Sequence, residues 1–412
     1  MNLLVVSSWC PYPSDNGSRL RAYHLIRQLA RRGHRIKLLA LAQEESDLAA
    51  AQSGLSPLCA LGVELFPSRF FRPGTVRALL GFFSTRPRHL LDTHQPEAAR
   101  RIARECRSGD CDAVLALELG VAHYVPSGMG VPCMLEQLEV SGFVKAVREA
   151  PSPRARLRRA LTLAKLRRHL ASLGERYAVW TAVSEAEAQA IQTLVGPAAP
   201  PVRVLPNGVD LDGNSYDPAA AYDPEGLIYN GALGFSANLD AVRWFSEEIL
   251  PIIQKERPGV RLRVTGRNDV LPPDDPLRRH PGIELTGYLD DVRPAVRGAA
   301  ACAAPLRQGG GTRLKILEAM ALGTPVVTTS RGAEGIAARD GQEIFIADAP
   351  ADFAAAVLRL MADRALRARA GAAGRRLVED RYGWDAVGVQ MATLLENFTR
   401  VENNSLCLSD KP

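Results

Sequence analysis

The stretch LLVVSSWCPYPSDNGSRLRAYHLIRQLARRGHRIKLLALA, residues 3–42, decides the fold. Its apolar start, Leu3–Val6, predicts a buried strand, and a loop rich in Pro, Asp, Asn and Gly follows up to Gly17. Apolar residues then recur at helical spacing over 20–29, before a glycine that is typical of a helix end. A second apolar run over 36–42 completes a β-loop-α-β unit, the building block of parallel α/β sheets.

The rest of the chain repeats this alternation in two halves. In the first half, strand-like runs at 113–117 and 179–183 alternate with helical stretches, and Ser184 with Glu187 has the capping-box spacing of a helix start. The Pro- and Gly-rich stretch 196–226 predicts a domain boundary. The elements expected after it are strands at 227–229, 262–265, 283–286, 300–305 and 325–328, and a helix over 238–256. We therefore expect two doubly wound α/β domains, in which ligands bind beyond the carboxyl ends of the strands.

The composition is that of an ordinary globular protein. The 412 residues are 46% hydrophobic and 23% charged, which suits two or three domains with apolar cores and excludes a disordered chain or a disulfide mini-protein. No apolar run approaches the roughly 18 to 20 residues of a membrane-spanning helix, and no secretion signal is visible. The seven cysteines are scattered, without a Cys-x-x-Cys pair or a His at metal-ligand spacing. We expect a cytoplasmic location and no metal site.

Basic residues are concentrated in two segments that lack acidic residues. The net charge is +6, but residues 151–174 alone carry seven arginines and lysines. Residues 65–91 carry five arginines among five phenylalanines. Basic and aromatic residues together favour binding to an anionic membrane surface. The alternative interpretation of the two segments is a solvated helix face and a buried aromatic cluster. No helix-turn-helix, RRM or zinc-finger pattern accompanies the charge, so we expect no nucleic-acid partner.

The strongest local motif is GGGTRLKILEAM, residues 309–320, between an expected strand and an expected helix. The residues that open it are Gly309, Gly310, Gly311 and Thr312. Glycines let the backbone approach a ligand closely, and the free N–H groups of a helix start favour an anion such as a phosphate. The segment is neither a Walker A loop nor a dinucleotide fingerprint. Arg313 and Lys315 are either phosphate-binding cations or ordinary surface residues of the first helical turn.

Three stretches, taken together, resemble the retaining GT-B glycosyltransferases of family 4. They are LKILEAMALGTPVV (314–327), VLPNGVD (204–210) and PYPSDNGSRLRAYHLIRQLARRG (11–33). The likeness covers essentially the whole chain, and it is closest to sugar transferases of bacterial surface-polysaccharide assembly. It implies two Rossmann-like domains that face each other across a cleft. Its parts would be an acceptor-side domain at 1–205, a nucleotide-sugar domain at 206–383, a helix at 384–400 that packs back on the first domain, and a tail at 401–412.

The resemblance also implies the residues of the donor site. Glu318 corresponds to the second glutamate of the family's Glu-x7-Glu motif, which holds the ribose hydroxyls of the nucleotide, and a carboxylate suits a vicinal diol. The other implied positions are Asn16 and Gly17 at the diphosphate, Asn230 and Gly231 on the donor side, Tyr288 and Leu289 at the base, and the loop that begins at Gly309.

Two departures from the family pattern bear on catalysis. The first glutamate of Glu-x7-Glu would fall at position 310, which is Gly310. The family's Arg and Lys pair after the first strand of the second domain is replaced by the uncharged run 232–239. We expect Arg313 and Lys315 to supply the missing cationic contacts to the diphosphate, through electrostatic stabilisation rather than a covalent nucleophile.

A polar group of the first domain is also expected near the anomeric carbon, where the family often has a His. The candidates are Glu118 and Glu136, both of which follow strand-like runs and both of which are also explicable as plain loop carboxylates. If the diphosphate is held elsewhere, Arg19 and Arg21 in the first loop are the next residues to consider.

The expected function is transfer of a sugar from a nucleotide-diphosphate sugar to a hydroxyl acceptor, with retention of configuration and no required cofactor. The acceptor would be a glycan or a lipid-linked saccharide, and the enzyme would lie peripherally on the inner face of the plasma membrane. Two alternatives stay open. One is a nucleotide-sugar epimerase, which needs no acceptor, and the other is a non-catalytic nucleotide-sugar-binding or membrane-surface scaffold protein, which Gly310 would suit.

Overall fold

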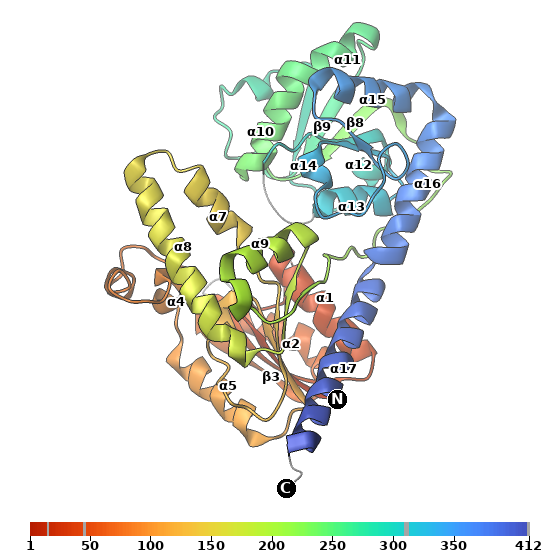
Figure 1. Cartoon of the computed structure of the whole chain (residues 1–412). Coiled ribbons are helices and arrows are strands. Elements are labelled where there is room, and N and C mark those ends of the chain that lie inside the picture. The colour runs from red at the N-terminus through yellow and green to blue at the C-terminus, as the bar shows by residue number, and fades with distance from the viewer. Residues whose placement is uncertain (15, 44–46, 309–312, 410–412) are drawn as a thin grey trace. The chain divides into compact units, whose positions relative to one another are not determined.

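The chain folds into two compact α/β units, each built on its own parallel sheet (Figure 1). The structure, a computed structural model, describes residues 1–14, 16–43, 47–308 and 313–409, and side chains as far as Thr399. The first unit holds residues 1–206 and the chain from 387 onward, and the second holds residues 207–386. The two sheets with their flanking helices confirm the expected pair of Rossmann-like domains.

The first unit has a seven-stranded sheet of order β3-β2-β1-β4-β5-β6-β7. Its strands are β1 (Asn2–Ser7), β2 (Arg35–Gln43), β3 (Gly62–Ser68), β4 (Ala113–Leu117), β5 (Cys133–Glu136), β6 (Val179–Ala182) and β7 (Val202–Val204). Its helices are α1 (Gly17–Arg31), α2 (Leu48–Leu55), α3 (Val76–Leu80), α4 (Arg88–Asp92), α5 (Pro96–Ser108), α6 (Leu119–Ala122), α7 (Ser141–Arg148), α8 (Pro153–Leu173) and α9 (Glu185–Val195). The strand order reverses between β1 and β4, so the carboxyl ends of these strands are the expected position for a ligand.

Strand β1 lies inside this sheet and is buried on both faces. Leu3 pairs with Ile36 of β2 and with Ala113 of β4, so β1 has a parallel neighbour on each side. Leu4 and Val6 pack into one core cluster with residues of α5, α8 and α9. The alternate side chains of β1 are also fully buried, on the opposite face. The continuous apolar run of β1 is therefore what a strand buried on both faces requires.

The second unit has a six-stranded sheet of order β10-β9-β8-β11-β12-β13. Its strands are β8 (Asp223–Asn230), β9 (Arg261–Thr265), β10 (Ile283–Gly287), β11 (Ala299–Ala304), β12 (Val326–Thr328) and β13 (Phe345–Ile346). Its helices are α10 (Ser236–Trp244), α11 (Leu250–Glu256), α12 (Arg293–Arg297), α13 (Leu314–Ala321), α14 (Ser330–Ala333), α15 (Pro350–Ala362) and α16 (Arg364–Arg381). Here the order reverses between β8 and β11, which makes their carboxyl ends the corresponding ligand position.

Two local features differ from the sequence expectations. The helix expected over 238–256 is interrupted by a π-helical turn at Phe245–Ile249. Pro251 explains the interruption, because a proline has no N–H to donate and its ring clashes with the carbonyl four residues earlier. At the start of α9, Ser184 caps the helix as expected, by accepting from the Glu187 N–H at 3.2 Å. The Glu187 carboxylate instead accepts from the Val140 and Ser141 N–H groups, at the start of α7.

The last helix, α17 (Trp384–Ser409), runs past residue 400, where the sequence analysis ends it. From residue 387 on it belongs to the first unit. A Cβ at Gly388 would lie 2.6 Å from the Gln28 Cβ of α1, so only glycine fits at this contact. At the other end, Gly208 lies against the Trp384 indole, which leaves no room for a side chain. Gly208, in the VLPNGVD stretch (204–210), therefore has a structural role.

Candidate functional site

The second unit brings Asn230 and Glu318 together at the point where its strand order reverses. Asn230 is the last residue of β8, and Glu318 lies on α13, which follows β11. The Asn230 amide donates to Glu318 Oε2 at 2.9 Å. Among the described residues, Asn230 Oδ1 has no hydrogen-bond partner although it is buried. The pair therefore offers acceptor atoms at the position where an α/β sheet binds its ligand.

Lys315 points its ammonium group at the same turn. Its Nζ donates to the Tyr229 hydroxyl and to Asn238 Oδ1, both at 2.8 Å, and lies 4.0 Å from the centre of the Tyr229 ring. A Cβ at Gly231 would lie 2.5 Å from this Nζ, so the glycine makes room for the cation. Lys315 thus places a positive charge beside the uncharged run 232–239.

Burial shifts the pKa values of Lys315 and Glu318 in opposite directions. It lowers the pKa of the Lys315 ammonium to about 7. An anion bound beside this group would raise the pKa again and favour the charged form. Burial raises the pKa of the Glu318 carboxyl, an effect that the nearby Lys315 and the Asn230 hydrogen bond partly offset. It also lowers the pKa of Arg313, which stands directly before α13. Perturbed groups of this kind are typical of functional sites.

The remaining expected donor residues are placed as follows. Gly309, Gly310, Gly311 and Thr312 lie outside the described residues. Tyr288 and Leu289 follow β10 at the same edge of the sheet, and the Tyr288 side chain is exposed. Asn16 and Gly17 belong to the first unit, where the Asn16 side chain caps α1 by accepting from the Arg19 N–H at 3.1 Å.

A pocket of about 450 Å³ lies in the first unit, at the carboxyl ends of its central strands. Ser8 and Trp9 follow β1, Glu118 follows β4, and Gln137 follows β5. The other residues of its wall include Ser18, Gln43, Arg69, Phe70, Phe71, His89, Glu139 and Phe143. Its size and mixed polar and aromatic lining suit a small organic ligand.

Glu118 has an unusual environment within this pocket. The Trp9 indole donates to Glu118 Oε2, and Ser18 also bonds to the carboxylate. Burial raises the pKa of Glu118 to about 7 despite these hydrogen bonds. Its backbone φ of 69° is rare for a residue with a side chain. Glu118 is therefore a strained, half-buried carboxyl that can exchange a proton near neutral pH.

Glu136 and Arg21, which the sequence offered as further candidates, belong to the core instead. Arg21 Nε donates to Glu136 Oε1 at 2.9 Å, and both side chains are 1% exposed. Arg21 also donates to the Leu205 and Pro206 carbonyls at 2.8 and 2.7 Å. These contacts engage the Arg21 guanidinium in the core, so of the two fallback residues Arg19 is the one left to consider for the diphosphate.

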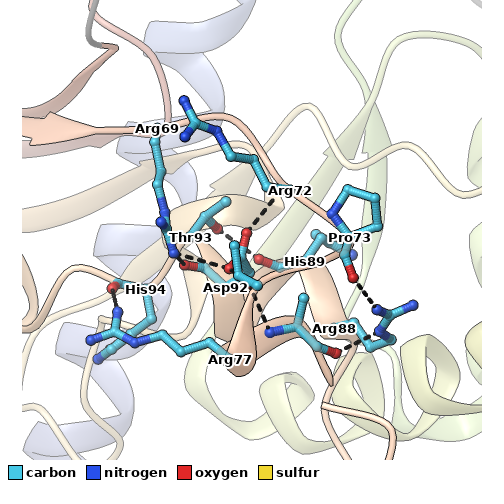
Figure 2. A network of polar contacts seen from close by, with 11 residues as sticks. Arg69, Arg72, Pro73, Arg77, Arg88, His89, Asp92, Thr93 and His94 are labelled. Atoms are coloured by element: carbon cyan, nitrogen blue, oxygen red, sulfur yellow. Dashed lines mark hydrogen bonds and ion pairs between the residues drawn. The ribbon is translucent and has the colours of Figure 1, made fainter. Parts of the chain in front are cut away.

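The segment 69–94 forms an ordered surface around the buried carboxylate of Asp92 (Figure 2). Asp92 accepts from the Arg69 guanidinium at 3.0 Å, from the Arg72 N–H at 2.9 Å and from the Thr75 hydroxyl. Arg88 donates to the Ala78 and Pro73 carbonyls and lies 3.8 Å from the centre of the Phe82 ring. Lys165 of α8 donates to the Gly81 and Phe82 carbonyls at 3.0 and 2.9 Å, which links the two basic segments.

This surface exposes apolar side chains, among them phenylalanines that the alternative interpretation of the sequence placed in a buried aromatic cluster. The exposed ones are Phe70, Phe71, Val76, Leu79, Leu80, Phe82 and Phe83, together with Leu157 and Leu161 of α8. Phe83 is 92% exposed, so the buried aromatic cluster is wrong for this residue and its exposed neighbours. In the part of the chain that the structure describes, no helix is long and apolar enough to cross a membrane.

Two family models match the chain. The model described as "Glycosyltransferase Family 4" matches residues 16–212, and the model described as "Glycosyl transferases group 1" matches residues 224–363. The chain belongs to the glycosyltransferases of family 4. The two matches fall on the two α/β units in turn, which agrees with the resemblance derived from the sequence.

Relatives and solved structures agree with this assignment. A phosphatidyl-myo-inositol mannosyltransferase of Mycobacterium leprae is 32% identical over 209 residues, which are 47% of this chain and 52% of the relative. The chain spans about half the length of the curated relatives it matches. Sucrose-phosphate synthase from Thermosynechococcus elongatus has a TM-score of 0.68 at 17% identity, covering 97% of this chain and 100% of that chain. Anabaena Alr3699/HepE in complex with UDP has a TM-score of 0.64 at 14% identity, covering 96% and 100%. The family 4 chain has the GT-B fold.

The sequence analysis missed several residues of the site at β8 and α13 and of the pocket in the first unit. Tyr229 and Asn238, the partners of Lys315, carry no motif; Tyr229 directly precedes the Asn230-Gly231 turn, and Asn238 lies in the uncharged run 232–239. Gln137 follows β5 directly, as Glu118 follows β4, and Trp9 stands two residues after β1, so the rule that ligands bind at the carboxyl ends of strands could have found them.

Proposed function

We propose that the chain is a retaining glycosyltransferase that moves a sugar from a nucleotide-diphosphate sugar to a hydroxyl of a glycan or lipid-linked saccharide. The observation that carries this proposal is the cluster of Asn230, Lys315 and Glu318 at the carboxyl end of β8. It combines acceptors for ribose hydroxyls with a cation for phosphate, and family membership supports the same reading.

Each residue of the cluster has a role that follows from its chemistry. The Glu318 carboxylate accepts from the vicinal ribose hydroxyls, with Asn230 fixing its orientation. Lys315 and Arg313 stabilise the negative charge that grows on the diphosphate as the bond to the sugar breaks, and the N-terminus of α13 adds its dipole. This electrostatic assistance needs neither a covalent nucleophile nor a resident metal, and it is consistent with a retaining reaction.

Glu318→Gln is the direct test of the donor site. We expect it to weaken the binding of a nucleoside diphosphate by about 1.5 to 3 kcal/mol, because one charge-assisted hydrogen bond to the ribose is lost. Isothermal titration calorimetry with UDP, GDP and ADP measures the change. Glu379→Gln removes a carboxylate that is 46% exposed elsewhere in the same unit and should leave affinity unchanged. Equal affinity of Glu318→Gln and the parent protein would remove Glu318 from the site.

Product analysis separates the proposal from its two alternatives. An epimerase changes the nucleotide sugar without any acceptor, whereas a transferase releases the nucleoside diphosphate and lengthens the acceptor. A non-catalytic binder would hold the nucleotide through Glu318 without turning over under any acceptor.

We also propose that the surface formed by residues 69–94 and α8 binds an anionic membrane from the cytoplasmic side. Its exposed phenylalanines and leucines can enter the headgroup region, and the surrounding arginines attract anionic lipids. Asp92 accepts from the Arg69 guanidinium and from the Arg72 N–H, which gives the backbone of this segment an ordered arrangement (Figure 2). Free thiols at all six described cysteines, Cys10, Cys59, Cys106, Cys111, Cys133 and Cys302, support a reducing compartment.

Liposome sedimentation tests the membrane surface. We expect the protein to sediment with anionic but not with neutral vesicles, and about 0.5 M salt to release it, because exposed charges are screened at that ionic strength. A Phe82→Ser, Phe83→Ser double variant should lose most of the binding. The matched control is Phe235→Ser, which removes a phenylalanine of the second unit that is 71% exposed. Equal sedimentation with both kinds of vesicle would contradict the proposal.

A further inference from the structure

Backbone strain is concentrated at one pocket of the first unit. Among the described residues, Glu118 and Gln137 are the non-glycine residues with positive φ, at 69° and 57°. Both line the pocket beside Trp9, and they follow the neighbouring strands β4 and β5. A positive φ is unfavourable for a residue with a Cβ, and it persists only where the surrounding structure compensates for it. Two such residues side by side indicate that their side chains are held in place for a ligand.

The polar part of the pocket is rich in hydrogen-bond acceptors. Trp9 and Ser18 donate to the Glu118 carboxylate, and Gln137 bonds to the Glu139 carboxylate. Each carboxylate has two oxygens with several lone pairs, so acceptor positions remain for hydroxyl groups. Two carboxylates and an amide around one hollow are suited to a molecule with several neighbouring hydroxyls.

Aromatic rings make up much of the remaining pocket wall. The Trp9 and Phe70 rings lie 5.8 Å apart, and the His89 and Phe143 rings are stacked 6.1 Å apart with an interplanar angle of 24°. Flat aromatic faces pack against the C–H face of a sugar ring, whose hydroxyls then point sideways to polar groups. The pocket therefore combines the two kinds of surface that a pyranose presents.

The charges of the pocket disfavour an anionic ligand. Among its described lining residues, Arg69 is the only arginine or lysine, and Asp92 already engages its guanidinium at 3.0 Å. Burial lowers the pKa of His89, which keeps its imidazole neutral at physiological pH. A phosphate or carboxylate in this pocket would lose water beside Glu118 and Glu139 without gaining a free cation.

We propose that this pocket binds the acceptor through an uncharged sugar ring and discriminates against an anionic group at the same position. Glu118 and Gln137 are the specificity-determining residues, and Glu118 contacts the sugar hydroxyls directly. This inference rests on the proposed transferase function and names its acceptor class. Any phosphate that links the sugar to a lipid would lie outside the pocket.

Saturation-transfer NMR with small alkyl glycosides tests the inference without turnover. The probes are hexyl glycosides of glucose, mannose, galactose and N-acetylglucosamine, compared with hexyl glucuronide and hexyl phosphate. We expect at least one neutral glycoside to bind saturably and both anionic probes to bind at least tenfold more weakly. Glu118→Gln should lower the affinity for the neutral glycoside about tenfold. Glu97→Gln, an exposed carboxylate on α5, is the matched control and should have no effect.

Gln137→Gly separates binding from folding. Glycine adopts positive φ without strain, so the melting temperature should stay unchanged or rise while glycoside affinity falls at least fivefold. A purely structural Gln137 would instead lower the melting temperature on removal.

Two results would overturn the inference. One is an anionic probe that binds as tightly as the neutral glycosides, and the other is the absence of a saturation-transfer signal from every neutral glycoside. Calorimetry with UDP, GDP and ADP is an independent readout. A protein that binds a nucleotide but no glycoside contradicts this inference alone. A protein that binds the glycosides but no nucleotide contradicts the proposed function.

Discussion

We expect Lys315→Met to lower kcat by roughly 10²- to 10³-fold, with a much smaller effect on nucleoside binding. Methionine keeps the length and packing of the side chain but removes the charge that lies beside Asn238 and Gly231. If that charge acts mainly when the diphosphate leaves, its loss raises the barrier more than it weakens the ground-state complex. Steady-state kinetics of sugar transfer measure the effect. Arg263→Met, in an exposed ion pair of the same unit, is the control.

The pH dependence of donor binding gives a second readout of the same residue. Because the pKa of Lys315 is lowered to about 7, the free protein loses this positive charge as the pH rises through 7. A bound diphosphate favours the charged form and raises the pKa in the complex. The affinity for a nucleoside diphosphate should therefore fall between pH 7 and pH 9, and Lys315→Met should flatten the profile. Near-normal kcat with an unchanged profile would place the diphosphate elsewhere, and Arg19 would be the next residue to test.

The continuous apolar strands were predictable, whereas three of the four edge strands, β3, β7 and β13, were not; the fourth, β10, was expected at 283–286. Strands β1, β4 and β11 are buried on both faces, so their sequences are continuous apolar runs. Strand β3, at one edge, contains Pro67 and has a largely half-buried pattern, while β7 and β13 have only three and two residues. Such short or partly exposed strands carry no clear periodicity.

Only the part of the candidate donor site that lies on α13 was predictable from the sequence. Lys315 and Glu318 are three residues apart, so they lie on the same face of α13. Their contacts to Tyr229, Asn238 and Asn230 join segments far apart in the chain, which no local pattern encodes.

Glu118 and Glu136 have similar positions in the sequence, and only the fold distinguishes their roles. Glu118 and Glu136 both stand at strand ends in the sequence. Glu136 is still part of β5 and points into the core, whereas Glu118 follows β4 and turns into the pocket through its positive φ. A difference of one residue in where the strand ends therefore separates a structural carboxylate from a candidate ligand-binding one.

We expect Arg21→Met to destabilise the first unit by about 3 to 5 kcal/mol, because it leaves the Glu136 carboxylate buried without its cation. The Leu205 and Pro206 carbonyls lose their donor at the same time. Urea denaturation followed by circular dichroism measures the loss. The exposed pair of Arg263 and Glu284 provides the control, since Arg263→Met should change stability by less than about 1 kcal/mol.

A double variant separates the two parts of this effect. Arg21→Met with Glu136→Leu removes both charges and fills similar volume, so it should recover part of the stability that the single variant loses. Recovery should stay incomplete, because the carbonyls of residues 205 and 206 still lack a donor. Full recovery would mean that these carbonyls find other partners, and no recovery would mean that the carbonyl contacts dominate. Since these carbonyls belong to the last residues of the first unit before the second begins, Arg21 joins the core of the sheet to the point where the chain leaves it.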